Sequence, residues 1–208
     1  MNIFRGLSAL PEFSNSVITI GSFDGVHQGH QKILKSIQQL AEENEGVDVV
    51  ITFHPHPREI VYPKDADLHI LTTLDEKLEY FRRSGVSNVV VVPFTIEFSQ
   101  QPAQEYIEKF IVSRFHPKYI VIGYDHRFGL NRAGNVHLLK MYGEDHGYEV
   151  VQIEEEELKD ITISSTKIRL ALQNNNIDLA NSLLGHPYMI KGQVVTGNRL
   201  GHHIGYPT

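Results

Sequence analysis

The sequence predicts an α/β fold, a Rossmann-like doubly wound parallel sheet of about five strands with helices on both faces. Three observations predict it. Nearly continuous runs of Val and Ile recur along the chain, helical patterns separate these runs, and segments rich in Gly and His follow several of them. In such a sheet the carboxyl ends of the strands lie at one edge, where ligands bind.

The expected strands are apolar on both faces, as parallel strands between two layers of helices should be. They cover residues 16–21, 47–53, 88–94, 118–123 and 148–153. Between them, apolar residues recur at helical spacing. Thr73 followed by Glu76 is a helix-start pattern, and Pro102 suits the first turn of another helix. We therefore expect helices over residues 28–43, 73–84, 102–115, 134–146 and 164–184, the last one broken near the sequence QNNN.

Composition excludes several classes of protein. The chain has 208 residues, 41% hydrophobic and 21% charged, which suits one α/β domain with at most a small appendage. Its net charge of −6 argues against a nucleic-acid scaffold, and no run of 18 apolar residues predicts a membrane span. The lack of cysteine excludes disulfides, thiolate catalysis and cysteine-bound zinc. We expect a cytoplasmic protein that binds neither nucleic acid nor membranes, and the oligomeric state stays open.

Two segments differ from the rest of the predicted fold. The run EEEELKD, residues 154–160, has no apolar periodicity and is expected to be a solvated loop. From about residue 185 glycines surround one strand-like piece, MIKGQVV. The sequence therefore predicts a domain over residues 1–184 and, over 185–208, a linker with the truncated β hairpin of a second domain. A single hairpin cannot bury enough surface to be stable alone, so we expect this end to fray.

The stretch GSFDGVHQGH, residues 21–30, follows the first strand and opens a helix. A helix start presents unpaired N–H groups and a partial positive charge, which suit a phosphate. Gly29 leaves room for phosphate oxygens, and His27 and His30 can donate hydrogen bonds to the same anion. The alternative is that one histidine only caps the helix. The glycines and the position after a strand favour the phosphate site.

The stretch ISSTKIR, residues 163–169, is a second candidate anion site. Hydroxyls at the start of the expected helix can cap it or bind an anion, and Arg169 can hold two phosphate oxygens at once. Taken alone, this pattern is better explained by an ordinary helix cap beside a surface arginine, because serine-rich caps are common. The hydroxyl residues concerned are Ser164, Ser165 and Thr166.

Two further segments follow strands of the same sheet. In FHPHP the prolines hold the chain extended, so His54 and His56 should point to opposite sides, with Phe53 at the base offering a planar surface. In GYDHRFGLNRAGN, residues 123–135, aromatic rings can stack on a ligand, an aspartate can accept hydrogen bonds and arginines can meet phosphate. These residues are Tyr124, Asp125, Arg127, Phe128 and Arg132. Each segment has a structural alternative, a stiffened strand exit or a polar turn.

Together, in this order and spacing, the four segments resemble the FAD synthetase module of the bacterial bifunctional riboflavin kinase/FAD synthetase family, part of the nucleotidyltransferase class marked by His-x-Gly-His. The resemblance covers nearly the whole chain. The end GQVVTGNRLGHHIGYPT is similar to the start of that family's riboflavin kinase domain, which continues past a Pro-Thr-Ala-Asn motif, whereas this sequence stops at Pro207-Thr208. The chain is expected to carry the adenylyltransferase half.

The resemblance implies that ATP and FMN react to give FAD and pyrophosphate, with Mg²⁺ carried by ATP and no metal site made by the protein. It implies catalytic roles for His27, His30 and Arg169. The implied ATP-binding residues are Gly21, Phe23, Asp24, Gly29, Gly123, Asp125, Ser164, Ser165 and Thr166. The implied flavin-binding residues are Phe53, His56, Pro57, Arg58, Asp125, Phe128 and Arg132. The chain departs from the family pattern at His54, where an acidic residue is common, and at His126, where an aromatic residue is common.

Three other functions compete with this one. A metal-dependent hydrolase would use the His-x-His pair of FHPHP with His27 and His30. A non-catalytic nucleotide- or flavin-binding module would need only one of the two phosphate sites. The same transfer chemistry on another phosphorylated acceptor, as in cytidylyltransferases, is the third. The aromatic content of the middle segments favours a flat acceptor.

Overall fold

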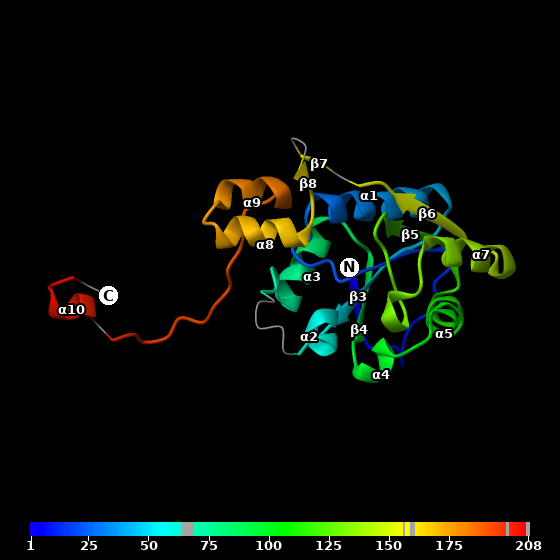
Figure 1. Ribbon diagram of the computed structural model, residues 1–208, viewed down its shortest axis with the longest axis horizontal. Coiled ribbons are helices and arrows are strands. Elements are labelled where there is room, and N and C mark those ends of the chain that lie inside the picture. Colours follow the sequence, from blue (N-terminus) through cyan, green and yellow to red (C-terminus); the bar gives the residue numbers. More distant parts are fainter. Residues whose placement is uncertain (64–68, 156, 159–160, 199, 207–208) are drawn as a thin grey trace.

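The computed structural model describes residues 1–63, 69–155, 157–158, 161–198 and 200–206. In this part of the chain, six parallel strands form one sheet in the order β1-β4-β3-β2-β5-β6 (Figure 1). Helices cover both faces, so the predicted Rossmann-like α/β class is confirmed. The strands are β1 (Asn2–Arg5), β2 (Ser16–Ile20), β3 (Asp48–His54), β4 (Asn88–Pro93), β5 (Pro117–Gly123) and β6 (Glu149–Ile153).

The strand order reverses beside β2. From β2 the chain moves to β3 and β4 on one side, whereas β5 and β6 lie on the other side. The loops that leave β2 and β5 therefore diverge and leave a crevice at the carboxyl edge of the sheet. The stretches GSFDGVHQGH and GYDHRFG are these two loops, so the topology brings together segments about a hundred residues apart.

The helices agree with the expected ones, with short additions. One face of the sheet is covered by α1 (Gln28–Glu43) and α3 (Leu74–Arg83), and the other by a continuous helical stretch from residue 103 to 115 and by α7 (Val136–His146). Thr73 forms the expected capping box with Glu76. The remaining helical segments are α2 (Pro57–Val61), α4 (Ile96–Ser99), α5 (Ala103–Glu105), η1 (Tyr106–Val112), α6 (Ser113–Phe115), η2 (Leu130–Arg132), α8 (Ser165–Gln173), α9 (Ile177–Leu184) and α10 (Leu200–His203).

Successive side chains of each central strand point to opposite faces of the sheet, so the core has two layers. On β2, Val17 packs with α1 and α3, whereas Ile18 and Ile20 pack with η1 and α7. All five residues of β2 are buried, because the strand is central and covered on both faces. The core fixes the position of the strand ends, and with them the loops that carry the candidate site residues.

A third, smaller apolar cluster attaches α8 and α9 to the sheet domain. It joins Ile168 of α8 and Leu183 and Leu184 of α9 to Leu71, which precedes α3. In Figure 1 the two helices lie beside α1 and α3, and the chain beyond α9 leads away from the sheet. The predicted break near QNNN is confirmed, because α8 ends at Gln173 and α9 begins at Ile177. This docking carries the stretch ISSTKIR to the carboxyl edge of the sheet.

Three expectations need correction or extension. The edge strand β1 was not predicted, because NIFR is too short to show a periodic pattern. No hairpin forms near the C-terminus: residues 186–198 and 200–206 contain no strand, and α10 lies among them. A hairpin without further strands has no core to pack on, which accounts for this difference. Within the expected loop 154–160, residues 156, 159 and 160 lie outside the described part, while β7 (Glu157–Leu158) pairs with β8 (Ile161–Thr162).

Among the described residues, no helix is both long enough and apolar enough to cross a lipid bilayer.

Removal of Ile168 tests the docking of α8. Ile168 is fully buried in the third cluster, so Ile168→Ala should lower the free energy of unfolding by about 2–4 kcal/mol, the usual cost of such a cavity. Leu170→Ala is the matched control on the same helix, because Leu170 is 51% exposed and should change stability by less than about 0.5 kcal/mol. Urea unfolding measures both. Equal losses would show that α8 does not dock through Ile168.

Candidate functional site

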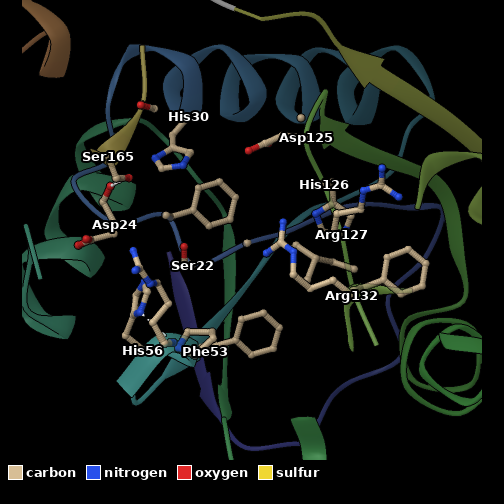
Figure 2. A pocket seen from close by; sticks show the side chains of 18 of the residues that line it. Ser22, Asp24, His30, Phe53, His56, Asp125, His126, Arg127, Arg132 and Ser165 are labelled. Carbon is tan, nitrogen blue, oxygen red and sulfur yellow. Dashed lines mark hydrogen bonds between the residues drawn. The ribbon is translucent and has the colours of Figure 1, made fainter. Parts of the chain in front are cut away.

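A cavity of about 900 Å³ lies at the carboxyl edge of the sheet, where the loops after β2, β3 and β5 meet the start of α8. It lies at the reversal of strand order, the usual ligand site of this architecture. Figure 2 shows Ser165 and His30 on one side of it and Arg127 and Arg132 on the other. Every residue to which the family resemblance assigns a role lines this cavity: Gly21, Phe23, Asp24, His27, Gly29, His30, Phe53, His56, Pro57, Arg58, Gly123, Asp125, Phe128, Arg132, Ser164, Ser165, Thr166 and Arg169.

The turn after β2 has an unusual backbone. Phe23, Gly25 and Val26 all have positive φ, at +50°, +82° and +41°. A branched residue such as Val rarely adopts this conformation, so packing must hold the turn in place. A Cβ on Gly25 would lie 2.8 Å from Leu71, so this position needs glycine for space as well as for φ. The strained turn places the start of α1 against the cavity.

His27 and His30 have different tasks in the first turn of α1. The Nδ1 atom of His27 accepts a hydrogen bond from the backbone N–H of His30, so His27 caps the helix. Because Nδ1 accepts, a neutral His27 carries its proton on Nε2, as a donor. The two rings stack with centroids 3.6 Å apart, and Nδ1 of His30 has no hydrogen-bond partner among the described residues. Capping and anion binding are therefore compatible in one motif.

Both histidines are held neutral. Burial lowers the pKa of His27 to about 4, although the carboxylate of Asp24 opposes the shift. Burial also lowers the pKa of His30 well below its usual value, with smaller contributions from His27 and Lys77. Near neutral pH the two rings are therefore hydrogen-bond donors to an anion rather than cations.

Asp24 links the turn after β2 to the rest of the site. Its carboxylate is buried and accepts hydrogen bonds from the backbone N–H groups of Leu71 and Thr72, at 2.9 and 3.1 Å. It also forms an ion pair with Arg169 of α8. We expected Asp24 to contact ATP, but in the structure its carboxylate is occupied by protein groups. These contacts of Asp24 fix the position of α8 relative to the turn after β2.

The start of α8 faces the turn across a short gap. The side chain of Ser164 caps the helix by accepting from the N–H of Lys167, and the hydroxyl of Ser165 donates to the backbone oxygen of Asp24 at 2.9 Å. Arg169 donates through Nε to the backbone oxygen of His69 at 2.7 Å and through Nη2 to Asp24. Two helix N-termini, those of α1 and α8, therefore meet at one side of the cavity.

The exit of β3 separates the two histidines of FHPHP. His56 is buried, lines the cavity and caps α2 through Nδ1, which accepts from the N–H of Arg58. His54 is exposed and does not line the cavity. The expected opposite orientation is confirmed, so the pair does not supply two ligands to one metal ion. Burial lowers the pKa of His56, which therefore favours the neutral form.

The loop after β5 supplies the opposite side of the cavity. Phe128 pairs with Gly134 as an isolated bridge, and a Cβ on Gly134 would lie 2.3 Å from the Phe128 ring. The loop is thus closed onto an aromatic ring that also stacks on Tyr106. Arg127 and Arg132 are exposed, so their guanidinium groups are accessible to a ligand. Arg127 and Arg132 therefore place positive charge on this side of the cavity.

The sequence did not point to several residues that do not line the cavity but contact or lie near residues that do. Lys77 is buried on α3 and donates to the hydroxyl of Thr52 at 3.5 Å; burial lowers its pKa to about 8. In the sequence it is only one polar residue of an amphipathic helix. His126, which the sequence marked only as a departure from the family pattern, lines the cavity; its Nε2 lacks a partner in the described structure, and burial lowers its pKa to about 4. Leu71 and Thr72 carry no sequence signal, since they act through backbone groups.

Within the described ranges, no three His, Asp or Glu side chains lie close enough together to form a candidate metal centre. The cavity does contain oxygen donors, since the carboxylate of Asp125 and the hydroxyls of Ser164 and Thr166 line it.

Comparison with known proteins gives the family. A family model described as FAD synthetase matches residues 10–167. The chain belongs to the FAD synthetase family. A second model, described as riboflavin kinase, matches residues 184–208. The FAD synthetase match covers strands β2 to β6, the cavity loops and the start of α8.

Relatives of this FAD synthetase family member are named as bifunctional enzymes, with riboflavin kinase and FMN adenylyltransferase in one name. The chain is 39% identical over its whole length to a bifunctional riboflavin kinase/FMN adenylyltransferase of Buchnera aphidicola and 38% identical to one of Escherichia coli. It spans 67% of the length of each. A Listeria monocytogenes protein of the same name is 36% identical over 93% of the chain, which spans 61% of that relative.

Solved structures extend the comparison to the fold. A Streptococcus pneumoniae protein titled as a macrolide-efflux protein matches all of this chain and 67% of its own, with a TM-score of 0.86 and 31% identity. A pantoate-β-alanine ligase of Francisella tularensis matches 88% of this chain and 86% of its own, with a TM-score of 0.52 and 13% identity. The second likeness concerns the fold alone. It shows that this sheet architecture serves more than one sequence family.

The buried histidines predict a loss of stability in acid. His27 and His126 each have a pKa lowered from 6.5 to about 4 by burial, so between these values the unfolded chain binds more protons than the folded one. Stability therefore falls as pH drops from about 6.5 toward 4, by up to about 3 kcal/mol for each such histidine. Urea unfolding at several pH values should show a shallower pH dependence for His126→Asn than for the parent.

The control for this prediction is His137→Asn, since His137 is exposed on α7. That variant should keep the full pH dependence of the parent. Identical pH dependence in all three proteins would show that burial does not keep His126 neutral.

Proposed function

We propose that this chain transfers the adenylyl group of ATP to FMN, which makes it the FMN adenylyltransferase part of a bifunctional flavin enzyme. A phosphate oxygen of FMN attacks the α-phosphorus of ATP, the bond from that phosphorus to the bridging oxygen breaks, and pyrophosphate leaves. The phosphate of FMN is already anionic, so no protein nucleophile is needed. The protein contributes position and charge stabilisation.

One observation carries the proposal: the starts of α1 and α8 lie together at one side of the cavity. The ion pair between Arg169 and Asp24, and the hydrogen bond from Ser165 to the backbone oxygen of Asp24, hold the start of α8 against the turn that opens α1. A binder of one phosphate group needs one such site. Two of them suit a polyphosphate whose charge shifts during transfer.

The side of the cavity between α1 and α8 is proposed to hold the triphosphate. His27 donates from Nε2, His30 lies beside it, and the backbone around Gly29 lies in the first turn of α1. Thr166 and Ser165 provide hydroxyls from the opposite helix. Donors placed before the reaction stabilise charge that develops on the leaving pyrophosphate, which is where they are most effective.

The side formed by the loops after β3 and β5 is proposed to receive the flavin. Phe128 and Phe53 line it as aromatic surfaces, and His56 presents Nε2 to it. The exposed guanidinium groups of Arg58, Arg127 and Arg132 and the carboxylate of Asp125 add polar groups at its rim. A flat, partly apolar ring with a phosphate tail matches this distribution of side chains.

Mg²⁺ is proposed to enter with ATP. The ion prefers oxygen ligands and keeps several waters, so one carboxylate and the phosphates of the nucleotide are enough to hold it. Asp125 and Glu154 are exposed carboxylates that line the cavity and could meet this need, whereas Asp24 is taken up by Arg169. When bound, the ion would neutralise charge on the phosphate oxygens.

Two other functions fit the site less well. A hydrolase that uses the His-x-His pair would need His54 and His56 in one site, but His54 lies outside the cavity. Transfer to a small, non-aromatic phosphate ester would leave the surfaces of Phe53 and Phe128 without a partner.

The segment that matches riboflavin kinase covers residues 184–208. We therefore propose domain limits of 1–184 and 185–208 and make no kinase assignment for this chain.

Incubation of the protein with FMN, ATP and Mg²⁺ tests the function. FAD and pyrophosphate should form in equal amounts, and label in the α-phosphate of ATP should appear in FAD. Glycerol phosphate in place of FMN should give no labelled product, because it offers no ring to the aromatic side of the cavity. Transfer of label to glycerol phosphate but not to FMN would contradict the proposed acceptor, and release of AMP alone would indicate a hydrolase.

His30→Ala separates a catalytic role of His30 from a structural one. The turnover number should fall about 10²–10³-fold, as for the loss of one preorganised donor. Nδ1 of His30 has no partner to lose, so the urea midpoint should fall only through the lost packing of the ring on His27 and Phe23. His137→Ala, at an exposed position of α7, is the control and should keep full activity. A large loss of stability with normal turnover of the folded fraction would assign His30 to the fold instead.

A further inference from the structure

The stretch that opens α1 carries two glutamines between and after its histidines. The histidines line the cavity, whereas Gln28 and Gln31 do not. Both glutamine side chains donate to backbone oxygens at the end of α9, Gln28 to that of Ser182 and Gln31 to that of Leu184. Carbonyl groups in the last turn of a helix lack partners within the helix. The two glutamines supply such partners and join the start of α1 to the end of α9.

Gln31 also holds the turn after β2. Its Nε2 lies 3.0 Å from the backbone oxygen of Val26 and 2.9 Å from that of Leu184. A carbonyl oxygen can only accept a hydrogen bond, and the amide nitrogen of glutamine carries two N–H donors, so both donors are used and the partners fix the orientation of the amide. The backbone N–H of Gln31 donates to the oxygen of His27 at 2.9 Å. One residue therefore binds two consecutive carbonyl groups of the turn and helix start, and at the same time the end of α9.

Val26 is a strained residue of this turn. It is buried and has a φ of +41°, a conformation that a β-branched residue keeps only where its surroundings hold it. Leu184 packs against the same turn, since a Cβ on Gly25 would lie 3.2 Å from its Cδ2 atom. The carbonyl that accepts from Gln31 belongs to the peptide group that also carries the N–H of His27. Without this bond, the peptide is free to rotate, and His27 moves with it.

We propose that Gln31 is a positioning residue for the adenylyl transfer: its amide ties the turn after β2 to the end of α9 and so fixes His27 and His30 for the phosphates of ATP. The inference rests on the proposed function. Gln31 does not line the cavity and acts through the backbone of Val26 and His27. The match to riboflavin kinase begins at residue 184, so the same amide joins the two matched parts of the chain.

One substitution at three positions separates the turn from the end of α9. Gln31→Met keeps the length of the side chain and removes both donors, which leaves two carbonyl groups without this partner. Gln28→Met removes a bond to α9 and keeps both side-chain bonds of Gln31. Gln39→Met makes the same change at an exposed position of α1, where the amide donates to Glu43, and is the control.

The constants kcat and KM for each substrate are measured in the FAD-forming assay, and urea unfolding shows that each variant is folded under the assay conditions. Gln31→Met should raise KM for ATP about tenfold, because the donors of the turn are displaced. KM for FMN should stay unchanged, because other loops form the flavin side of the cavity. Gln28→Met and Gln39→Met should keep the KM of the parent for ATP. A role in folding alone would lower the urea midpoint and the amount of active protein but leave both KM values unchanged.

Three results are informative against the account. An unchanged KM for ATP in Gln31→Met would overturn the inference while leaving the function intact. An equal rise in Gln28→Met would assign the effect to the attachment of α9 rather than to the carbonyl of Val26, and would overturn it as well. Absence of FAD formation by the parent would instead overturn the function.

Discussion

The site depends on the buried carboxylate of Asp24. It belongs to the turn after β2, accepts hydrogen bonds from the backbone of Leu71 and Thr72, and is paired with Arg169 of α8. A buried charge without partners is very unfavourable, so these contacts hold three chain segments in one arrangement. The starts of α1 and α8, which meet at one side of the cavity, owe their relative position to this group. The proposed chemistry is a consequence of that arrangement.

The same pair limits what mutation of Arg169 can show. Its guanidinium is shared between Asp24 and the backbone oxygen of His69. Removal of one partner of a buried ion pair typically costs about 3–5 kcal/mol, because the other charge is left buried and alone. A loss of activity in an Arg169 variant would therefore mix catalysis with stability. His30 gives a cleaner answer, since the Nδ1 atom of its buried ring makes no hydrogen bond to the described residues.

The sequence predicted the structural features that depend on residues close together in the chain. Three features are visible in short stretches of sequence and are present in the structure. They are the Gly-rich turn with His27 and His30 at the start of α1, the cap of α3 at Thr73, and the break between α8 and α9. Prediction failed where position depends on distant contacts. Asp24 and Arg169 are 145 residues apart, and nothing in either local sequence announces their pairing. The predicted hairpin near the C-terminus failed for the opposite reason, because a local strand pattern has no effect without neighbouring strands.

A crystal structure with FMN and an ATP analogue that cannot be cleaved between its α- and β-phosphates tests the central claim most directly. Our account predicts that the phosphate chain lies between His27 and His30 on one side and Ser165 and Thr166 on the other. The phosphate of FMN should point at the α-phosphorus from the side of the loop after β5. Phosphates bound elsewhere, or α8 moved away so that Arg169 no longer pairs with Asp24, would contradict it.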